Sequence, residues 1–390
     1  MNPLDRRSFL QMAGLASMAS IASESFAQAD AGKIIRETVK PSSEDTKPKY
    51  KVKFSVIGLD HSHIMSMTAA VLRGGGELVS VLSTNTEGLK EKQLADFRKQ
   101  FGDVKVAESE DEILQDKSIQ LVLAAPIPDQ RAPLGIRVMK SEKDFLSDKP
   151  AITTLKQLSD VRKTIKETKR KFAIMYSERL EVPSAVKAGE LVHAGAIGKV
   201  IQTVNLAPHR VNEPVRPAWF FEKSRYGGIL TDIGSHQADQ FLFYTNSTKA
   251  KVVASQAGNL AYPHRPNFED FGDMMLTGNG GTGYVRVDWF TPDGLGVWGD
   301  GRLFILGTEG YIELRKYVDP AGKSGGNHLV IVDKKATRYL DCSNVKLPFG
   351  EEFVADIVNR TEISQNQEQA LLAAELVLKA QKNATKPVVA

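Results

Sequence analysis

Apolar, strand-like runs alternate with helical segments between residues 51 and 150, and this alternation constrains the fold more than any other feature. The strand-like runs are residues 51–57, 78–82 and 119–124. The segments with a helical pattern are residues 64–73, 89–101, 108–114 and 131–140. Because parallel strands need a crossover between them, strands that alternate with helices predict a parallel, doubly wound sheet. We place this α/β domain at residues 50–170.

The first strand-to-helix turn is where such a sheet would bind a dinucleotide, since ligands lie at the carboxyl ends of the strands. The turn reads Gly58-Leu59-Asp60-His61-Ser62-His63, so only the first glycine of a G-x-G-x-x-G fingerprint is present. A carboxylate at position 60 is unfavourable beside a pyrophosphate unless it turns away, whereas His61 or His63 could donate to a phosphate. Gly58, Asp60 and His61 are our cofactor-binding candidates in this turn.

Further cofactor-binding candidates lie at the neighbouring strand ends. Ser83 and Thr84 follow the second strand, where the acidic residue that usually binds the ribose of NAD is missing, and Pro126 follows the third strand. Hydroxyl side chains could bind a ribose or tolerate a 2′-phosphate, so the sequence leaves the choice between NAD and NADP open. Lys149, in Asp148-Lys149-Pro150, lies at the end of the next strand and is also a candidate.

Asp60, His61 and His63 also form a donor set that could bind a metal ion. Two histidines at i and i+2 in a tight turn need a third ligand from elsewhere, and the sequence does not indicate one. The single cysteine, Cys342, excludes an intramolecular disulfide and a thiolate-cluster metal site. We therefore expect a cofactor-facing or helix-capping turn and no metal.

The pattern changes after residue 199, where short strands follow one another with few helices between them. The strand-like segments are residues 200–206, 250–256, 271–276, 283–289, 302–306, 311–315 and 329–333. Helical patterns return at residues 351–358 and 366–381. Consecutive strands joined by short turns predict a large open, mainly antiparallel sheet with its helices kept apart. We place this second α/β domain at residues 171–390, opening with a strand at residues 171–176.

One segment of the second domain carries candidate acid/base chemistry. It reads Tyr226-Gly227-Gly228-Ile229-Leu230-Thr231-Asp232-Ile233-Gly234-Ser235-His236. Asp232 and His236 are four residues apart and share one face of a helix, so the carboxylate could orient the imidazole and stabilise its charge. A capping aspartate with a buried histidine is the alternative, and the segment by itself does not decide between them.

Asp148-Lys149-Pro150 and the Gly227-to-His236 segment together resemble motifs of the glucose–fructose oxidoreductase/inositol dehydrogenase/MocA (Gfo/Idh/MocA) family. The turn Gly195-Ala196-Ile197-Gly198-Lys199-Val200 and the hairpin Gly307-Thr308-Glu309-Gly310 are similar to two further family motifs. The resemblance covers residues 50 to about 380. It implies an N-terminal Rossmann-type parallel sheet followed by an α/β domain with a large open, mainly antiparallel sheet that often mediates homo-oligomerisation.

The resemblance also implies roles for the residues that match the motifs. Lys149 would lie near the nicotinamide and donate to the reacting hydroxyl, and His236 would be the acid/base group, with Asp232 beside it. An ammonium near a hydroxyl lowers the pKa of that hydroxyl, which favours alkoxide character as hydride leaves. Arg131 departs from the family, which commonly has histidine at this position.

Three residues of the second domain are candidate substrate ligands. Arg210 could bind a substrate oxygen, and Tyr226 replaces a glycine common in the family and could narrow the pocket. Trp219 could stack on a sugar face or on the nicotinamide, although ordinary packing explains a tryptophan equally well.

The N-terminal residues predict export. Arg6-Arg7 followed by Phe9-Leu10, a mildly apolar stretch and Ser25-Phe26-Ala27 is similar to a twin-arginine signal peptide, which we place at residues 1–27. An ordinary secretory signal is the alternative. Residues 28–49 show no apolar period and are predicted to be a linker. Because the twin-arginine machinery carries folded proteins, we expect a periplasmic or otherwise exported protein that loads its NAD or NADP beforehand and binds it tightly.

Composition excludes two other classes of function. The formal net charge is only +4 and there is no basic stripe with interleaved aromatics, which argues against a nucleic acid partner. No apolar run reaches 18 residues, so no membrane-spanning helix is predicted.

The leading hypothesis is an NAD(P)-dependent oxidoreductase that acts on a hydroxyl of a sugar, glycoside or cyclitol, with Lys149 and His236 at the interdomain cleft. One alternative is a redox-neutral enzyme that cleaves or epimerises a glycoside with a retained NAD. The other is a sugar-binding scaffold without catalysis, which the incomplete glycine fingerprint favours and the presence of Lys149, Asp232 and His236 opposes. The fold alone does not decide among them.

Overall fold

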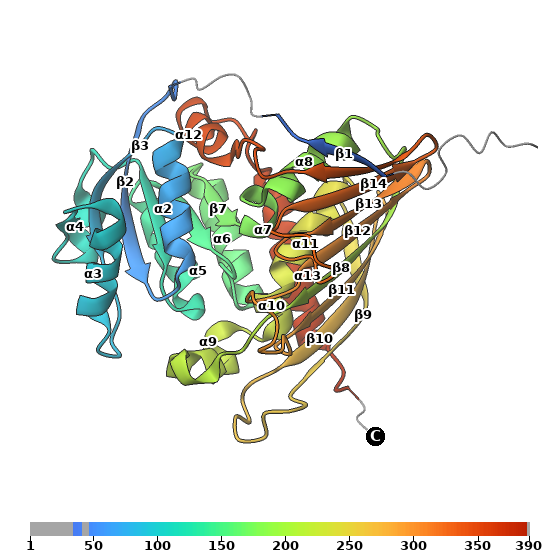
Figure 1. Cartoon of the computed structure of the whole chain (residues 1–390). Helices are drawn as coiled ribbons and strands as arrows, with labels where there is room; N and C mark the ends of the chain where they lie inside the picture. The colour runs from blue at the N-terminus through green and yellow to red at the C-terminus, as the bar shows by residue number, and fades with distance from the viewer. Residues whose placement is uncertain (1–33, 41–46, 388–390) are drawn as a thin grey trace, which may run out of the picture.

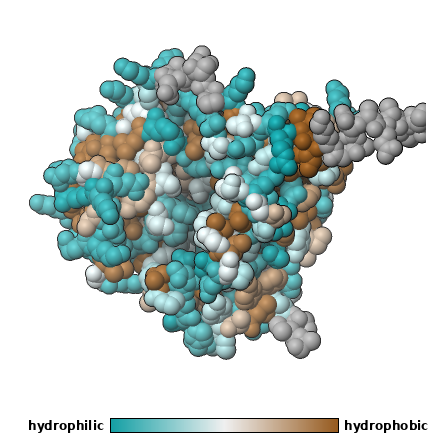
Figure 2. All heavy atoms as spheres, viewed as in Figure 1, coloured by the Kyte–Doolittle hydropathy of each residue, from teal (hydrophilic) through white to brown (hydrophobic). Residues whose placement is uncertain are grey.

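The computed structural model describes residues 34–40 and 47–387, which form two α/β domains side by side (Figure 1). In the same orientation, the space-filling view shows a mixture of hydrophilic and apolar residues on the face of both domains (Figure 2). The predicted signal at residues 1–27 lies outside the described residues, as do residues 28–33 and 41–46 of the predicted linker.

The N-terminal domain is built on a six-stranded sheet in which all neighbouring strands are parallel. In spatial order the strands are β4 (Lys105–Val106), β3 (Gly76–Leu82), β2 (Val52–Leu59), β5 (Leu121–Ala125), β6 (Asp144–Asp148) and β7 (Phe172–Met175). The helices are α2 (His63–Arg73), α3 (Lys90–Phe101), α4 (Glu110–Gln115), α5 (Pro128–Lys140) and α6 (Leu155–Thr168). The central strands are buried along nearly their whole length, as in a sheet covered on both faces. The predicted Rossmann-type sheet is confirmed.

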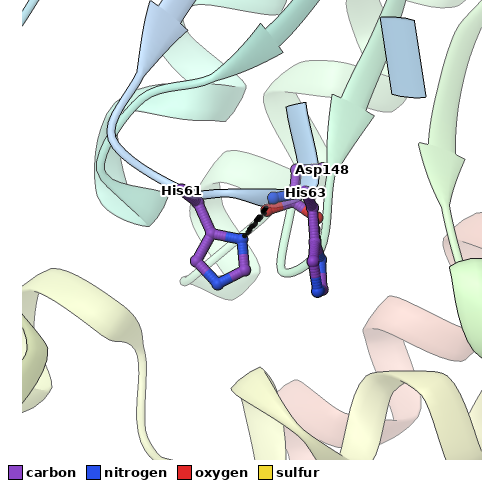
Figure 3. A group of neighbouring side chains, drawn as sticks. All are labelled: His61, His63 and Asp148. Carbon is purple, nitrogen blue, oxygen red and sulfur yellow. Dashed lines mark hydrogen bonds and ion pairs between the residues drawn. The ribbon is translucent and has the colours of Figure 1, made fainter. Parts of the chain in front are cut away.

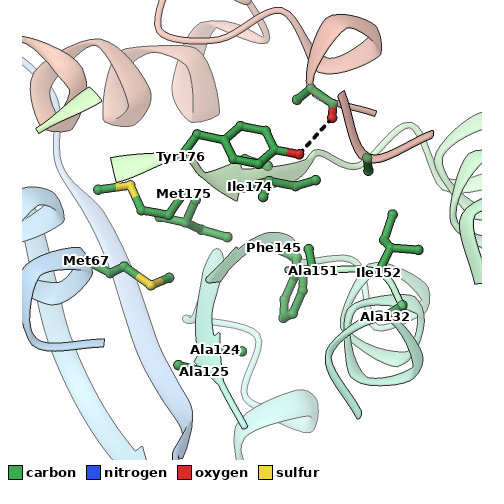
Figure 4. Close-up of a cluster of buried hydrophobic side chains, with 14 of the residues drawn as sticks. Met67, Ala124, Ala125, Ala132, Phe145, Ala151, Ile152, Ile174, Met175 and Tyr176 are labelled. Carbon is green, nitrogen blue, oxygen red and sulfur yellow. Dashed lines mark hydrogen bonds between the residues drawn. The ribbon is translucent and has the colours of Figure 1, made fainter. Parts of the chain in front are cut away.

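The core of this domain lies between the sheet and its helices (Figure 4). Met67 of α2, Ala124 of β5 and Phe145 of β6 are fully buried. Gly135 allows α5 to approach the sheet closely, because a Cβ atom there would lie 2.5 Å from a ring atom of Phe172. This packing fixes the strand ends that face the second domain.

Strand β7 corrects the predicted domain boundary. It pairs in parallel with β6 and therefore belongs to the first sheet, so the boundary falls after Met175 rather than at residue 170. Its outer edge is closed by side chains from far along the chain. The N–H of Phe172 donates to Oε1 of Gln367 at 2.8 Å, and the N–H of Ile174 donates to Oε1 of Gln365 at 3.2 Å. A four-residue buried run carries no sequence signal for the sheet it joins.

The C-terminal domain is built on a nine-stranded sheet. In spatial order the strands are β1 (Ile34–Thr38), β15 (Thr337–Asp341), β14 (His328–Asp333), β13 (Gly310–Arg315), β12 (Arg302–Gly307), β8 (Val200–Pro208), β11 (Thr282–Asp288), β10 (Phe271–Gly278) and β9 (Ala250–Gly258). Neighbouring strands are antiparallel except for the pairs β1–β15 and β8–β11. The predicted large, mainly antiparallel sheet is confirmed.

The helices of this domain are α7 (Ser177–Leu180), α8 (Pro183–His193), α9 (Lys223–Tyr226), α10 (Ile229–Asp232), α11 (Gly234–Tyr244), α12 (Phe349–Asn359) and α13 (Gln367–Asn383). Two 3₁₀ turns lie at Glu213–Val215 and Ala218–Phe221. Helices α8, α11 and α13 lie between the sheet and the N-terminal domain (Figure 1). None of the helices in the described ranges combines the length and apolar composition needed to cross a bilayer.

Strand β1 corrects the predicted linker. Residues 34–38 pair in parallel with β15, from Ile34 beside Thr337 to Thr38 beside Asp341. All five side chains of β1 are exposed. The strand is therefore held at the sheet edge chiefly by backbone hydrogen bonds, which leave no apolar alternation for a sequence pattern to detect.

Candidate active site

A cavity of about 450 Å³ lies between the carboxyl ends of the first sheet and the C-terminal domain. Both domains line it. The predicted site residues in its wall are Asp60, His61, Lys149, Arg210, Trp219, Asp232 and His236. The structure thus brings together all three predicted catalytic residues, which are up to 87 positions apart in the chain (from 149 to 236).

Lys149 and Asp232 form an ion pair across the two domains. Nζ of Lys149 lies 2.9 Å from Oδ1 of Asp232, and the two side chains are 6% and 15% exposed. Burial raises the pKa of Asp232, but the Lys149 ammonium lowers it more, so the net pKa lies below its usual value. The carboxylate is therefore charged and holds the ammonium at the cavity wall.

Asp232 does not orient His236, contrary to the prediction. Helix α10 ends at Asp232 and α11 begins at Gly234, so the N–H of His236 donates to the carbonyl of Ile233 instead of that of Asp232. The carboxylate is directed to Lys149, and Nδ1 of His236 has no hydrogen-bond partner among the described residues. Burial lowers the pKa of His236 well below its usual value. The neutral imidazole can accept a proton, as a general base must.

The carboxylate of Asp148, next to Lys149, contacts both histidines of the first turn (Figure 3). Nδ1 of His63 hydrogen-bonds with Oδ1 of Asp148 at 2.9 Å, and Nδ1 of His61 lies 2.9 Å from Oδ2. Nη2 of Arg131 lies 3.1 Å from the same Oδ2. Burial raises the pKa of Asp148, but Arg131 and the two imidazoles lower it to well below its usual value. Burial also lowers the pKa of His61 to about 4.

Asp148 is the third donor that the sequence did not indicate for a metal site. Donor atoms of His61, His63 and Asp148 lie within 4.8 Å of one another. The carboxylate, however, is shared with the guanidinium of Arg131, and a positive neighbour disfavours a second cation. The group is accounted for as an ionic and hydrogen-bonded cluster, and the absence of a metal stays a prediction.

The first turn fits a dinucleotide better than its sequence indicates. Gly58 has φ of +82°, and a Cβ atom there would lie 2.6 Å from the nitrogen of Pro126, so only glycine fits this approach of β2 to β5. The carboxylate of Asp60 accepts from Nδ2 of Asn85 at 2.6 Å and from Nε2 of Gln93 at 3.2 Å. It is held towards the end of β3, which removes the expected conflict with a pyrophosphate at the start of α2.

Four of the predicted cofactor ligands do not line the cavity, namely Gly58, Ser83, Thr84 and Pro126. The hydroxyl of Ser83 donates to Oε1 of Gln93 at 2.7 Å, and Thr84 follows it at the end of β3. Pro126 packs against Gly58. Ser83 and Pro126 shape the strand ends, because their side chains are already engaged or packed in the domain, whereas the hydroxyl of Thr84 is buried without a hydrogen-bond partner among the described residues.

Two of the predicted substrate ligands have other partners. The hydroxyl of Tyr226 accepts from the N–H of Glu269 at 3.0 Å, and the buried ring does not line the cavity, so the predicted narrowing role is wrong. Arg210 reaches the cavity, but its guanidinium donates to the carbonyls of Pro292, at 2.9 Å, and Leu295. Arg210 therefore anchors a loop. Trp219 lines the cavity as predicted.

Aromatic side chains form one wall of the cavity, here called the aromatic wall: Trp219, Trp289, Trp298 and Tyr317, of which only Trp219 was predicted. The chain has three tryptophans, and Trp219, Trp289 and Trp298 all line the cavity. The ring centroids of Trp298 and Tyr317 lie 4.5 Å apart. Trp219 follows β8, Trp289 and Trp298 lie between β11 and β12, and Tyr317 follows β13, so no local motif connects all of them.

A buried charge pair, formed by Glu178 of the cavity wall and Lys316, was also not predicted. Nζ of Lys316 lies 2.7 Å from Oε2 of Glu178, which also accepts from Nε2 of Gln237 at 2.9 Å. Glu178 follows β7 at its carboxyl end, so the rule that places ligands at such ends would have singled it out had β7 been assigned to the first sheet.

Two family models match the chain. Residues 52–176 match the oxidoreductase family with an NAD-binding Rossmann fold, and residues 185–313 match the GFO/IDH/MocA C-terminal domain. A protein from Erwinia carotovora atroseptica, described as an oxidoreductase, is 46% identical in sequence. Its crystal structure has a TM-score of 0.82 over 86% of this chain and 100% of that chain. The chain belongs to the Gfo/Idh/MocA oxidoreductase family.

Other similar proteins are more distant. This Gfo/Idh/MocA chain is 25% identical over 193 residues to 1,5-anhydro-D-fructose reductase of Ensifer adhaerens, covering 47% of this chain and 54% of that protein. It is 24% identical to D-xylose dehydrogenase of Paenarthrobacter nicotinovorans, covering 32% of this chain and 34% of that protein. The chain thus spans about half the length, or less, of these curated relatives. Levoglucosan dehydrogenase, solved with NADH and levoglucosan, shares the fold at 16% identity, with a TM-score of 0.69 over 85% of this chain and 97% of that chain.

Proposed function

We propose that this Gfo/Idh/MocA protein is an exported oxidoreductase that transfers hydride between a tightly bound NAD or NADP and a hydroxyl of a sugar, glycoside or cyclitol. The observation that carries the proposal is the meeting of Lys149, from one domain, and His236, from the other, in the wall of one cavity. The names of the curated relatives, a reductase and a dehydrogenase of sugars, support a carbohydrate substrate.

The proton chemistry is divided between two residues. The Lys149 ammonium, held by Asp232, donates to the substrate hydroxyl and stabilises the alkoxide that develops as the C–H bond breaks. The neutral imidazole of His236 accepts the hydroxyl proton. A dinucleotide held by the first turn and beside Lys149 would supply the acceptor for the hydride, which leaves with the electron pair of that C–H bond. The charged cluster around Asp148 holds the backbone of Lys149 in place, since the N–H of Lys149 donates to Oδ1 of Asp148 at 2.8 Å.

The aromatic wall supports a sugar ring as the substrate. Flat indole and phenol faces stack well on the C–H face of a pyranose and leave its hydroxyls free for polar groups. Trp298 is 44% exposed, although its ring also packs against His209 and Tyr317, with centroids 4.5 Å apart in each pair. Trp219→Ala should therefore weaken substrate or cofactor binding more than it slows turnover.

Two variants test the chemistry. Lys149→Ala and His236→Ala should each lower turnover by about 10²–10⁴-fold while the protein stays folded. The double variant should be little worse than either single one, because the residues act as one unit. Lys156→Ala, an exposed change on α6, is the matched control. Thermal unfolding and the dinucleotide released on denaturation report whether each variant is intact.

The outcomes separate the candidate functions. Near-normal turnover in both single variants would reject the proposed site. A wild-type protein that neither releases nor binds a dinucleotide would favour the scaffold. Cleavage of a glycoside with no net change in the redox state of a retained cofactor would favour the redox-neutral enzyme.

Export has its own test, motivated by Arg6 and Arg7. Changing both residues to lysine should leave unprocessed precursor in the cytoplasm, as cell fractionation would show. The same change at Arg73, in α2 of the folded domain, is the control. Export of the double variant at the wild-type level would indicate an ordinary secretory signal or another route.

A further inference from the structure

The carboxylate of Asp60, in the turn after β2, lies at the end of the neighbouring strand β3. It reaches Asn85 and Gln93, which lie beyond the end of β3. Oδ1 of Asn85 accepts from the N–H groups of Glu87 and Leu89, both at 2.9 Å, so its Nδ2 must face Asp60. Gln93 bonds through Oε1 with the hydroxyl of Ser83 and through Nε2 with Asp60, whose ionised carboxylate can only accept. The orientation of the Asn85 amide is therefore fixed by bonds that are independent of Asp60.

Only one oxygen of this carboxylate is used. Both amides donate to Oδ1, and Oδ2 of Asp60 has no hydrogen-bond partner in the part of the chain that the structure describes. Asp60 is half-buried and lines the cavity. An ionised carboxylate can accept about four hydrogen bonds, so Asp60 keeps the capacity to accept from two neighbouring hydroxyls.

In a doubly wound fold the adenosine ribose of a dinucleotide lies at the end of the second strand, where an acidic residue accepts from its hydroxyls. Ser83, Thr84 and Asn85 occupy that strand end here, and none is acidic. Asp60 brings the missing negative charge to the same place from the preceding turn. No lysine or arginine forms a salt bridge with Asp60 among the described residues, so its charge is available.

We propose that Asp60 accepts the hydroxyls of the adenosine ribose and makes the protein selective for NAD over NADP. The inference rests on the proposed function, since it requires a bound dinucleotide. The carboxylate favours a free 2′-hydroxyl by hydrogen bonding and disfavours a 2′-phosphate by charge repulsion. Asp60 occupies the position of the second glycine of the fingerprint, so the same residue that weakens the motif supplies the specificity.

The test measures binding rather than activity. Calorimetry on full-length protein stripped of nucleotide would use NAD⁺, NADP⁺ and the NAD⁺ analogue that lacks the 2′-hydroxyl of adenosine. Wild-type protein should bind NAD⁺ about 10- to 100-fold more tightly than either of the others. Asp60→Asn should remove most of this preference and bind NAD⁺ and the deoxy analogue equally. Asp103→Asn, which removes the same charge at a site that is 95% exposed, should keep the wild-type pattern.

Several results would overturn the inference. Equal affinity of the wild type for NAD⁺ and NADP⁺, an unchanged preference in Asp60→Asn, or full affinity of the wild type for the deoxy analogue would each exclude the proposed contact. The analogue needs only wild-type protein, so the test stands even if the variant does not fold. Failure to bind any dinucleotide would contradict the proposed function as well, whereas binding without selectivity contradicts only the role of Asp60.

Discussion

Three histidines, of which one is buried and two are half-buried, make the stability of the protein depend on pH. Burial lowers the pKa of His61 and of His209 to about 4, and it lowers the pKa of His236 well below its usual value. In the unfolded chain an imidazole titrates near 6.5. Between these values the unfolded chain binds protons that the folded protein does not. The contribution of these histidines to the free energy of unfolding is therefore complete above about pH 6.5. It is lost as the pH falls through this window.

The midpoint of thermal unfolding should decrease between pH 7 and pH 4.5. His209→Gln should flatten this decrease, because it removes one titrating group, whereas His193→Gln, an exposed change at the end of α8, should not. The depressed pKa values of Asp148 and Asp232 act only below about pH 4 and do not contribute to this window. A midpoint that stays constant from pH 7 to pH 4.5 would contradict the account.

At the scale of single residues, the sequence predicted which side chains lie in one cavity better than it predicted their hydrogen-bond and ion-pair partners. Lys149, Asp232 and His236 line one cavity, as the motifs indicated. The partner of Asp232 was wrong, because the i, i+4 argument considers one helix and the ammonium of Lys149 comes from another domain. Asp60 was interpreted as an obstacle because its distant amide partners leave no local signature.

At the scale of elements, Arg210 anchors the loop that carries Trp298 to the cavity. Its guanidinium donates to Pro292 and Leu295, and its N–H donates to the carbonyl of Trp298 at 2.7 Å. Arg210→Met keeps the aliphatic stem but removes the donors. We expect KM for the substrate to rise about tenfold with a smaller change in kcat, since the loss affects binding by the aromatic wall.

Steady-state kinetics and limited proteolysis of residues 291–300 would measure this effect. Arg286→Met, on β11, is the control because Arg286 pairs with Asp288 instead of the loop. A lower kcat with an unchanged KM would show that Arg210 serves the reaction and not the loop.

Strands β1 and β15 show where pattern-based prediction stops. The strands between β8 and β14 alternate buried and exposed side chains and were predicted, since one face meets the helices. Strand β15 has only one fully buried residue, Leu340, and β1 has none. Strands at a sheet edge can be held mainly by backbone hydrogen bonds. Such bonds place little restriction on residue type, so the sequence shows no pattern that predicts the strand.

At the scale of the whole molecule, we expect self-association through the outer face of the nine-stranded sheet, as the family resemblance implies. No helix of the described residues covers it (Figure 1), and several apolar side chains on its neighbouring strands are exposed. The exposed apolar residues of these strands are Ile201, Val253, Met275, Phe304, Leu306 and Tyr311. An apolar surface of this kind is typical of protein–protein contacts.

We expect the wild-type protein to be a homo-oligomer in light scattering at micromolar concentration. Met275→Asp combined with Phe304→Asp should shift it to monomers, because each change places a charge in the contact. Val358→Asp, an exposed apolar position on α12, should leave the oligomer intact. A monomeric wild type would contradict the proposal.

The closure of β7 by Gln365 and Gln367 has a consequence for synthesis. The strand leaves the ribosome 191 to 195 residues before the side chains that satisfy its outer edge. During that interval the N-terminal sheet has an open edge, which can pair with other chains. Any chain that stops before residue 365 keeps this edge open. The first domain is therefore protected against aggregation at this edge only after the last part of the chain has been made.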